Sequence, residues 1–175
     1  MVRTLPPDSE TLMNSPKVVD LPTAAGICRT LRSERQSTAV QIVFTNGCFD
    51  LLHVGHVRLL AKAKSLGDIL IVGLNSDSSV RGLKGAERPI IPVADRAEML
   101  AGLAAVDYVV IFDESTPINL VKAIMPDVLV KGGNWTLETI VGRTEVENAG
   151  GKVVVIPLAE SYSTSALIAR VRSLK

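Results

Sequence analysis

The chain has 175 residues, of which 47% are hydrophobic and 21% are charged, a composition typical of a folded globular protein rather than a disordered one. Nineteen Lys and Arg residues nearly balance 18 Asp and Glu residues, and only 3% of the chain is aromatic. These figures argue against a nucleic-acid-binding surface and against a polybasic membrane anchor. No apolar run approaches the roughly 18 residues that cross a bilayer, so we expect neither a nucleic acid nor a membrane as partner.

The cysteines and the start of the chain indicate the compartment. Two cysteines without a Cys-x-x-Cys pair cannot form a disulfide framework, and residues 1–16 lack the apolar core of a signal peptide. We therefore expect a cytoplasmic protein. Two histidines and two cysteines make no standard zinc set, so we expect no metal held by the protein alone.

Strand-like and helical patterns alternate along the chain. Residues 1–16 are polar and aperiodic and are expected to form a flexible extension, followed by a single domain over residues 17–175. After a first helical pattern from Leu21, five β-rich runs alternate with helical ones, which is typical of a parallel sheet. The expected strands are Gln41–Thr45, Ile69–Leu74, Tyr108–Phe112, Val128–Lys131 and Val153–Pro157; the later helices are Val54–Leu66, Val93–Ala105, Pro117–Met125, Leu137–Ala149 and Ser165–Arg172. The predicted fold class is α/β, a doubly wound, Rossmann-like sheet of five parallel strands with helices on both faces.

Ligands of such sheets bind beyond the carboxyl ends of the strands, near the point where strand order reverses. Two familiar nucleotide-binding patterns are missing there. No G-x-G-x-x-G follows the first strand, and no G-x-x-x-x-G-K-[ST] occurs in the chain. The sequence thus disfavours ordinary dinucleotide redox chemistry and P-loop hydrolysis.

The turn after the first strand carries both histidines of the chain. His53 and His56 lie three residues apart, so both rings project from one side of the first turn of a helix. A helix N-terminus offers free amides and partial positive charge, and Gly55 allows a phosphate to approach the backbone. A pair of histidines that only caps the helix is the alternative. Two rings that flank a glycine at this turn favour a polyphosphate cradle.

Other strand ends supply further candidates. Lys84 stands between Gly82 and Gly85, and we expect a loop that swings over a bound triphosphate, although a surface lysine is the alternative. Lys131 precedes two glycines that permit a close backbone approach to a ligand. Ser163 and Thr164 open the last helix and form a second anion site or an ordinary cap.

The segment Asn46-Gly47-Cys48-Phe49-Asp50 followed by His53-Val54-Gly55-His56 resembles the signature of the nucleotidyltransferase superfamily with the H-x-G-H motif. Members transfer a nucleoside monophosphate from a nucleoside triphosphate to a phosphate and release pyrophosphate, without a covalent enzyme intermediate. The resemblance implies catalytic roles for His53, His56 and Lys84. It implies nucleotide binding by Thr45, Asn46, Gly47, Cys48, Phe49, Gly55, Lys131, Gly132, Gly133, Ser163 and Thr164, and substrate binding by Asp50, Asn75, Asp77, Arg88, Arg96 and Trp135. For Arg96 a helix salt bridge, and for Trp135 simple packing, are the alternatives.

Over residues 17–172 the chain is similar to one subfamily, the adenylyltransferase half of the bifunctional heptose 7-phosphate kinase/heptose 1-phosphate adenylyltransferase and its stand-alone forms. Segments such as Leu83-Lys84-Gly85, Arg88-Pro89-Ile90 and Lys131-Gly132-Gly133-Asn134-Trp135 carry this resemblance, although Asn134 stands where many relatives have Asp. It implies AMP transfer from ATP to a heptose 1-phosphate, with Mg²⁺ brought by ATP, a homodimer, and a separate sugar kinase. CTP with glycerol 3-phosphate, or a non-catalytic nucleotide-binding module, remain alternatives.

Overall fold

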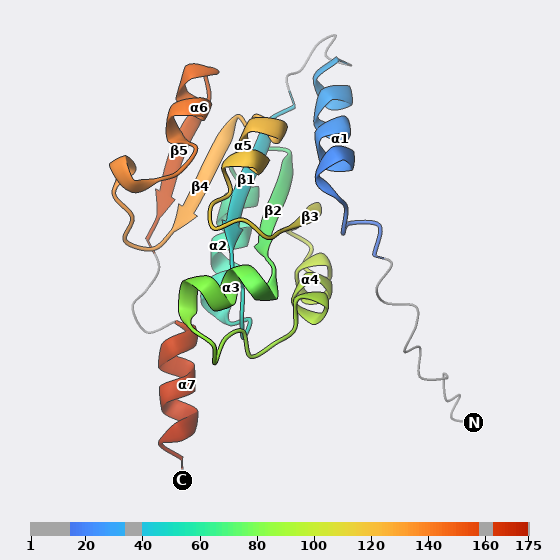
Figure 1. Ribbon diagram of the computed structural model, residues 1–175. Coiled ribbons are helices and arrows are strands. Elements are labelled where there is room, and N and C mark those ends of the chain that lie inside the picture. Colours follow the sequence, from blue (N-terminus) through green and yellow to red (C-terminus); the bar gives the residue numbers. More distant parts are fainter. Residues whose placement is uncertain (1–14, 34–39, 158–162, 175) are drawn as a thin grey trace, which may run out of the picture.

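The computed structural model describes residues 15–33, 40–157 and 163–174, and within them five strands form one parallel sheet. The strands are β1 (Ile42–Gly47), β2 (Ile69–Asn75), β3 (Tyr108–Phe112), β4 (Val128–Gly132) and β5 (Lys152–Ile156). Their order across the sheet is β3-β2-β1-β4-β5 (Figure 1). The chain moves outward from β1 to β3 and then returns to the other side of β1, so strand order reverses between β1 and β4. The doubly wound α/β fold is confirmed.

Helices cover both faces of this sheet. The helices are α1 (Leu21–Ser33), α2 (Val54–Lys64), α3 (Asp77–Lys84), α4 (Val93–Ala101), α5 (Ile118–Ile124), α6 (Arg143–Asn148) and α7 (Thr164–Arg172). One core cluster joins α2 and α4 to the sheet, through residues such as Leu60 and Leu100. The other joins α1, α5 and α6 to the opposite face, through Cys28, Leu120 and Val146. No helix in the described part of the chain is long and apolar enough to cross a membrane.

A short segment before α1 shields one edge of the sheet. Val18 pairs with Val109 of β3, and the backbone of Val19 donates to the Val109 carbonyl at 3.0 Å. The Lys17 ammonium donates to the Val106 carbonyl at 2.8 Å. These contacts occupy hydrogen-bonding groups that an edge strand would otherwise offer to other chains. Residues 1–14, most of the expected flexible extension, lie outside the described residues.

Two local predictions were wrong. The Lys84 segment is helical from Asp77 to Lys84, because the Ser76 hydroxyl accepts from the Ser79 amide and caps α3. The single helix expected over Leu137–Ala149 is instead a 3₁₀ turn (η2, Leu137–Thr139) followed by α6. Gly142 separates the two at φ 91°, and a side chain there would lie 2.9 Å from Val121 Cγ2. The break therefore needs glycine.

Candidate active site

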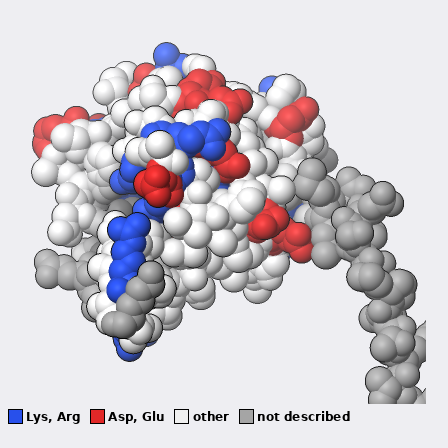
Figure 2. Space-filling model, turned by 60° about the horizontal axis from the view of Figure 1, so that its bottom comes forward, with Lys and Arg blue, Asp and Glu red and all other residues white. Residues whose placement is uncertain are grey.

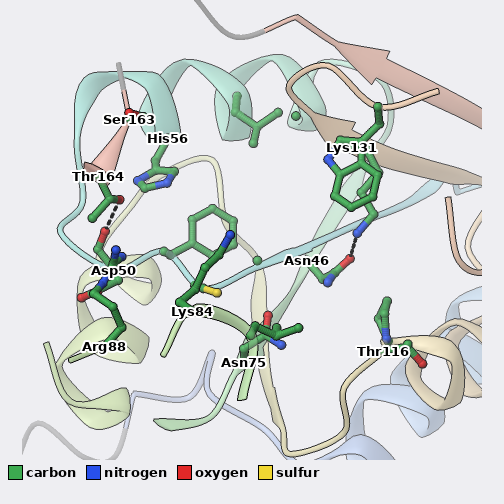
Figure 3. A pocket seen from close by; sticks show the side chains of 18 of the residues that line it. Asn46, Asp50, His56, Asn75, Lys84, Arg88, Thr116, Lys131, Ser163 and Thr164 are labelled. Carbon is green, nitrogen blue, oxygen red and sulfur yellow. Dashed lines mark hydrogen bonds and ion pairs between the residues drawn. The ribbon is translucent and has the colours of Figure 1, made fainter. Parts of the chain in front are cut away.

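A pocket of about 590 Å³ opens at the carboxyl end of the sheet, where strand order reverses (Figure 3). It is lined by the ends of β1, β2 and β4, by the start of α7 and by segments that follow β3 and β4. The pocket thus lies where the rule for open α/β sheets expects a ligand.

The turn from β1 into α2 has an unusual backbone. Phe49 and Leu51 have positive φ values of 46° and 49°, a conformation that residues other than glycine rarely adopt. Such backbone strain is concentrated at functional sites. His53 is the last residue before α2, and His56 lies in the first helical turn of α2.

The two imidazole rings stack on each other. The ring centroids of His53 and His56 lie 3.8 Å apart at 20°, and Phe49 packs 5.2 Å from His56. Within the described part of the chain, Nδ1 of each ring is buried without a hydrogen-bond partner. Burial, together with the neighbouring His53, lowers the pKa of His56 to about 4, and burial also lowers the pKa of His53. Both rings are therefore neutral at pH 7, and each carries one N–H.

Asp50 fixes the segment that follows α3. Its carboxylate is 1% exposed and accepts hydrogen bonds from Arg88 Nε at 2.5 Å and from the amides of Ile90 and Ile91. Burial opposes the charge, but these amides and Arg88 outweigh it and hold the pKa of Asp50 below its usual value. The Asp50 carbonyl accepts from the Thr164 hydroxyl at 2.7 Å and so joins α7 to the same turn.

Arg96 joins several strand ends from beneath the pocket. Its side chain is fully buried and donates to the carbonyls of Cys48, Asn75 and Ile91 at 2.6, 2.8 and 2.9 Å. It also pairs with the Asp77 carboxylate at 2.7 Å. With these donors occupied, the Arg96 guanidinium holds the strand ends and Asp77 together, and substrate binding by Arg96 and Asp77 stays a prediction.

Lys131 places a cation in the pocket wall. The side chain is 8% exposed, donates to Asn46 Oδ1, and lies 5.5 Å from the centre of the Trp135 ring. Burial lowers the pKa of Lys131 to about 8, because no carboxylate pairs with its ammonium among the described residues. An anionic ligand would supply the missing counter-charge.

Lys84 lies at the last position of α3, just before Gly85 at φ 94°. The same pocket contains Cys48, whose pKa burial raises, so its thiol is protonated at pH 7. Lys and Arg side chains gather at the end of the molecule where α3 and α7 lie, with acidic side chains interspersed (Figure 2). Among the described lining residues, Asp50 is the one carboxylate. The pocket therefore favours anions.

Most of the residues predicted from the sequence meet in this pocket. Those that line it are Asn46, Gly47, Cys48, Phe49, Asp50, His56, Asn75, Lys84, Arg88, Lys131, Gly132, Trp135, Ser163 and Thr164. Those outside the lining are Thr45, His53, Gly55, Asp77, Arg96 and Gly133. Leu83 and Ser165, which belong to segments that the sequence analysis singled out, also line the pocket. Sequence reasoning missed Leu59, Ser115, Thr116, Pro117, Thr139 and Val141. Ser115 and Thr116 follow the carboxyl end of β3, where a ligand is expected in such sheets, but no motif there indicates a particular chemistry.

Comparison with known families identifies this constellation. Residues 44–170 match the family described as cytidylyltransferase-like. The chain belongs to the cytidylyltransferase-like family. The matched range runs from β1 into α7 and therefore includes the whole pocket.

Several relatives of this cytidylyltransferase-like chain share one name. It is 49% identical over 167 residues to the bifunctional protein HldE of Geotalea uraniireducens, covering 95% of this chain and 32% of that protein. It is 59% identical over 133 residues to the bifunctional protein HldE of Acidiphilium cryptum, covering 76% and 27%. The chain thus spans about a third, or less, of the length of these curated relatives.

Solved structures share the fold. A lipopolysaccharide core biosynthesis protein from Thermoplasma volcanium superposes with a TM-score of 0.58 at 26% identity, covering 71% of this chain and 99% of that one. A pantoate-beta-alanine ligase from Francisella tularensis superposes with a TM-score of 0.56 at 16% identity, covering 85% and 68%. The second likeness concerns the fold alone.

Proposed function

We propose that this chain transfers AMP from ATP to a heptose 1-phosphate, giving an ADP-heptose and pyrophosphate. The observation that carries the proposal is the meeting of His56 at the start of α2, Lys84 and the start of α7 in one pocket that favours anions. Such a pocket suits a polyphosphate. The choice of sugar rests on the heptose-enzyme resemblance and on the relatives named HldE.

In the proposed reaction, a phosphate oxygen of the sugar phosphate attacks the α-phosphorus of ATP. The bond from that phosphorus to the bridging oxygen breaks, and pyrophosphate leaves with the bonding electrons. Such a transfer depends on positioning and charge neutralisation more than on a protein nucleophile. His56 and the free amides of α2 stabilise the charge on the reacting phosphate, and Lys84 neutralises the departing pyrophosphate.

We propose that Mg²⁺ enters with ATP. Among the described residues, no group of three or more His, Cys, Asp or Glu side chains is placed to hold a metal ion. The pocket therefore suits a cation that is held mainly by phosphate oxygens and water. Asp50 is the carboxylate among the described lining residues that could add a protein oxygen. When bound, Mg²⁺ would neutralise phosphate charge.

The family description, cytidylyltransferase-like, favours CTP and therefore a second candidate, for which the sequence analysis named glycerol 3-phosphate as the acceptor. Pyrophosphate release, measured with four nucleoside triphosphates against a panel of sugar and polyol phosphates, separates the two. We expect the highest kcat/KM for ATP with a heptose 1-phosphate. A preference for CTP with glycerol 3-phosphate would establish the alternative, and no release with any pair would indicate a non-catalytic nucleotide-binding module.

The partners proposed with this activity are ATP, a sugar phosphate, a second copy of the chain and a separate sugar kinase. This chain spans about a third of the length of its bifunctional relatives, so a separate kinase stays a prediction. The homodimer and the cytoplasmic location are predictions as well. Light scattering of the purified protein tests the dimer through its mass.

A further inference from the structure

Two residues that sequence reasoning missed, Ser115 and Thr116, share one side of the pocket with two that it predicted, Asn46 and Asn75. Asn46, Asn75 and Thr116 lie along one side in Figure 3, away from His56, Asp50 and Thr164. Asn75 ends β2, and Thr116 follows β3, so both lie on the side of β1 that is opposite to β4. Ser115 lines the pocket beside Thr116. We call Asn46, Asn75, Ser115 and Thr116 the neutral side.

Hydrogen bonds hold this side in a defined position. The Asn75 amide nitrogen donates to Ser79 Oγ at 2.9 Å, and that hydroxyl donates to the Glu114 carbonyl at 3.0 Å. The Ser76 amide donates to the Phe112 carbonyl at 2.9 Å. The start of α3 therefore anchors the segment that carries Ser115 and Thr116.

The same network decides which atoms face a ligand. Because the Ser79 proton goes to Glu114, Ser79 Oγ accepts from Asn75 Nδ2, and Asn75 Oδ1 is left as an acceptor. Lys131 can only donate, so it takes Asn46 Oδ1 and leaves Asn46 Nδ2 as a donor. Within the described part of the chain, the hydroxyls of Ser115 and Thr116 have no partner. The neutral side thus presents uncharged donors and acceptors together.

This chemistry matches a polyhydroxylated ring, since each ring hydroxyl both donates and accepts. The ribose of ATP also has hydroxyls, but nucleotides bind at the reversal point between β1 and β4, where Trp135 and Thr139 line the pocket. Asn75, Ser115 and Thr116 lie beyond that point, next to β2 and β3, and Asn46 on β1 lies between them and β4. We propose that Thr116, with Ser115, Asn75 and Asn46, binds the ring hydroxyls of the acceptor sugar phosphate and selects for a sugar over a shorter polyol. This inference rests on the proposed function.

The test is steady-state kinetics of Thr116→Val and Ser115→Ala, using the sugar phosphate that the unchanged protein turns over best. We expect each change to raise KM for that sugar phosphate about threefold to tenfold, the effect of one lost neutral hydrogen bond, with KM for ATP within twofold. Thr116→Ser, which keeps the hydroxyl, should restore the original KM. Thr144→Val, exposed on α6 and outside the pocket lining, is the matched control and should leave KM for the sugar phosphate unchanged.

A second measurement separates ring contacts from phosphate contacts. Replacing the sugar phosphate by glycerol 3-phosphate should remove most of the difference between Thr116→Val and the unchanged protein. The inference is overturned if both variants keep KM for the sugar phosphate within twofold, or if KM for ATP rises equally. The melting temperature of each variant shows whether it is folded. If Thr116→Val melts at a lower temperature than the unchanged protein, the KM values of Ser115→Ala and Thr116→Ser test the inference instead. If the unchanged protein turns over no sugar phosphate, the proposed function fails and the sugar site fails with it.

Discussion

At the scale of single residues, the stacked rings of His53 and His56 are uncharged, and each has a ring nitrogen without a hydrogen-bond partner among the described residues. The 3.8 Å stack disfavours double protonation, because two imidazolium rings would repel each other at that distance. A neutral ring still has one N–H to donate to a phosphate. In the proposed reaction, the pair would act as a preorganised donor that needs no proton uptake before the ligand arrives.

We expect His56→Ala to lower kcat by about two to three orders of magnitude, because the proposed reaction uses the N–H of this pocket-lining ring as a donor to the reacting phosphate. His53→Ala should have a smaller effect, since His53 lies outside the pocket lining and supports the His56 ring by stacking. Single-turnover rates of pyrophosphate release measure both. Val57→Ala, on the same helix and exposed, is the control. A His56→Ala protein that keeps more than a tenth of the original kcat would contradict the role.

Lys131 leads to a prediction about stability. Below its folded pKa of about 8 the lysine is charged in both the folded and the unfolded state, and the fold bears the penalty of burying the ammonium. That penalty is relieved as pH rises from about 8 towards the unfolded value of 10.5. We expect Lys131→Met to raise the free energy of unfolding at pH 7 by about 1–2 kcal/mol, after allowing for the lost bond to Asn46.

Urea unfolding of Lys131→Met at pH 7 and at pH 10.5 tests this. The gain in unfolding free energy from Lys131→Met should be smaller at pH 10.5, where Lys131 of the folded, unchanged protein is largely neutral. We also expect weaker ATP binding, because a residue kept for function at the expense of stability is typical of binding sites. A variant that is less stable at pH 7 would mean that contacts with Asn46 and Trp135 outweigh the burial penalty.

At the scale of secondary-structure elements, Arg96 shows how the strand ends are held in register around the pocket. One guanidinium from α4 bonds to the segment after β1, to the end of β2 and to the start of α3. Its planar group provides five donors in fixed directions, which a lysine cannot replace. The shape of the pocket therefore depends on a side chain that does not line it.

We expect Arg96→Met to lower the free energy of unfolding by about 3–5 kcal/mol, because it leaves the Asp77 carboxylate and three carbonyls without their donor. Arg96→Lys should recover less than half of that loss. Urea denaturation gives both values, and Arg81→Met, on the exposed side of α3, should change stability by less than about 0.5 kcal/mol. A loss below about 1 kcal/mol for Arg96→Met would show that the surrounding groups find other partners.

The same scale shows what sequence patterns could predict. The β-branched runs placed all five strands to within two residues, because strands buried on both faces read as continuous apolar segments. The helix α3 was missed, since eight residues with an internal glycine give a weak signal. The inward turn of Arg96 could not be predicted, because its four partners come from three separate stretches of the chain. Ser115 and Thr116 belong to no motif and are brought to the pocket only by the order of the strands.

At the scale of the whole molecule, charge is balanced overall and concentrated locally. A net charge of +1 accompanies a pocket in which Lys84, Arg88 and Lys131 face one lining carboxylate. The basic side chains of α3 and α7 extend this field to the surface (Figure 2). Anions are therefore attracted to the open end of the sheet, and this attraction weakens as salt is added.

Acid should lower the free energy of unfolding through the protonation of His56 in the pocket. The folded pKa of His56, about 4, lies below the unfolded value of 6.5, so the unfolded state binds more protons between those pH values. The His56 contribution to stability is thus complete above pH 6.5 and is lost as pH falls towards 4. Its size is on the order of 2 kcal/mol once partial exposure is taken into account. Carboxylates such as Asp50, with a lowered pKa, lose their contribution only at still lower pH.

We expect His56→Gln to flatten the dependence of unfolding free energy on pH between 6.5 and 4.5, because glutamine takes up no proton in either state. The difference between this variant and the unchanged protein isolates His56, since every carboxylate is common to both. Urea unfolding at half-unit pH steps provides the two curves, and His53→Gln, with a smaller loss of buried imidazole, should change the slope less. A non-hydrolysable ATP analogue with Mg²⁺ should also make the unfolding free energy of the unchanged protein depend less steeply on pH. Phosphate charge beside His56 would raise the pKa of the imidazole towards the unfolded value. Identical curves for the unchanged protein and His56→Gln would mean that the imidazole is hydrated in the folded state, and would remove the basis for a dry phosphate cradle at the start of α2.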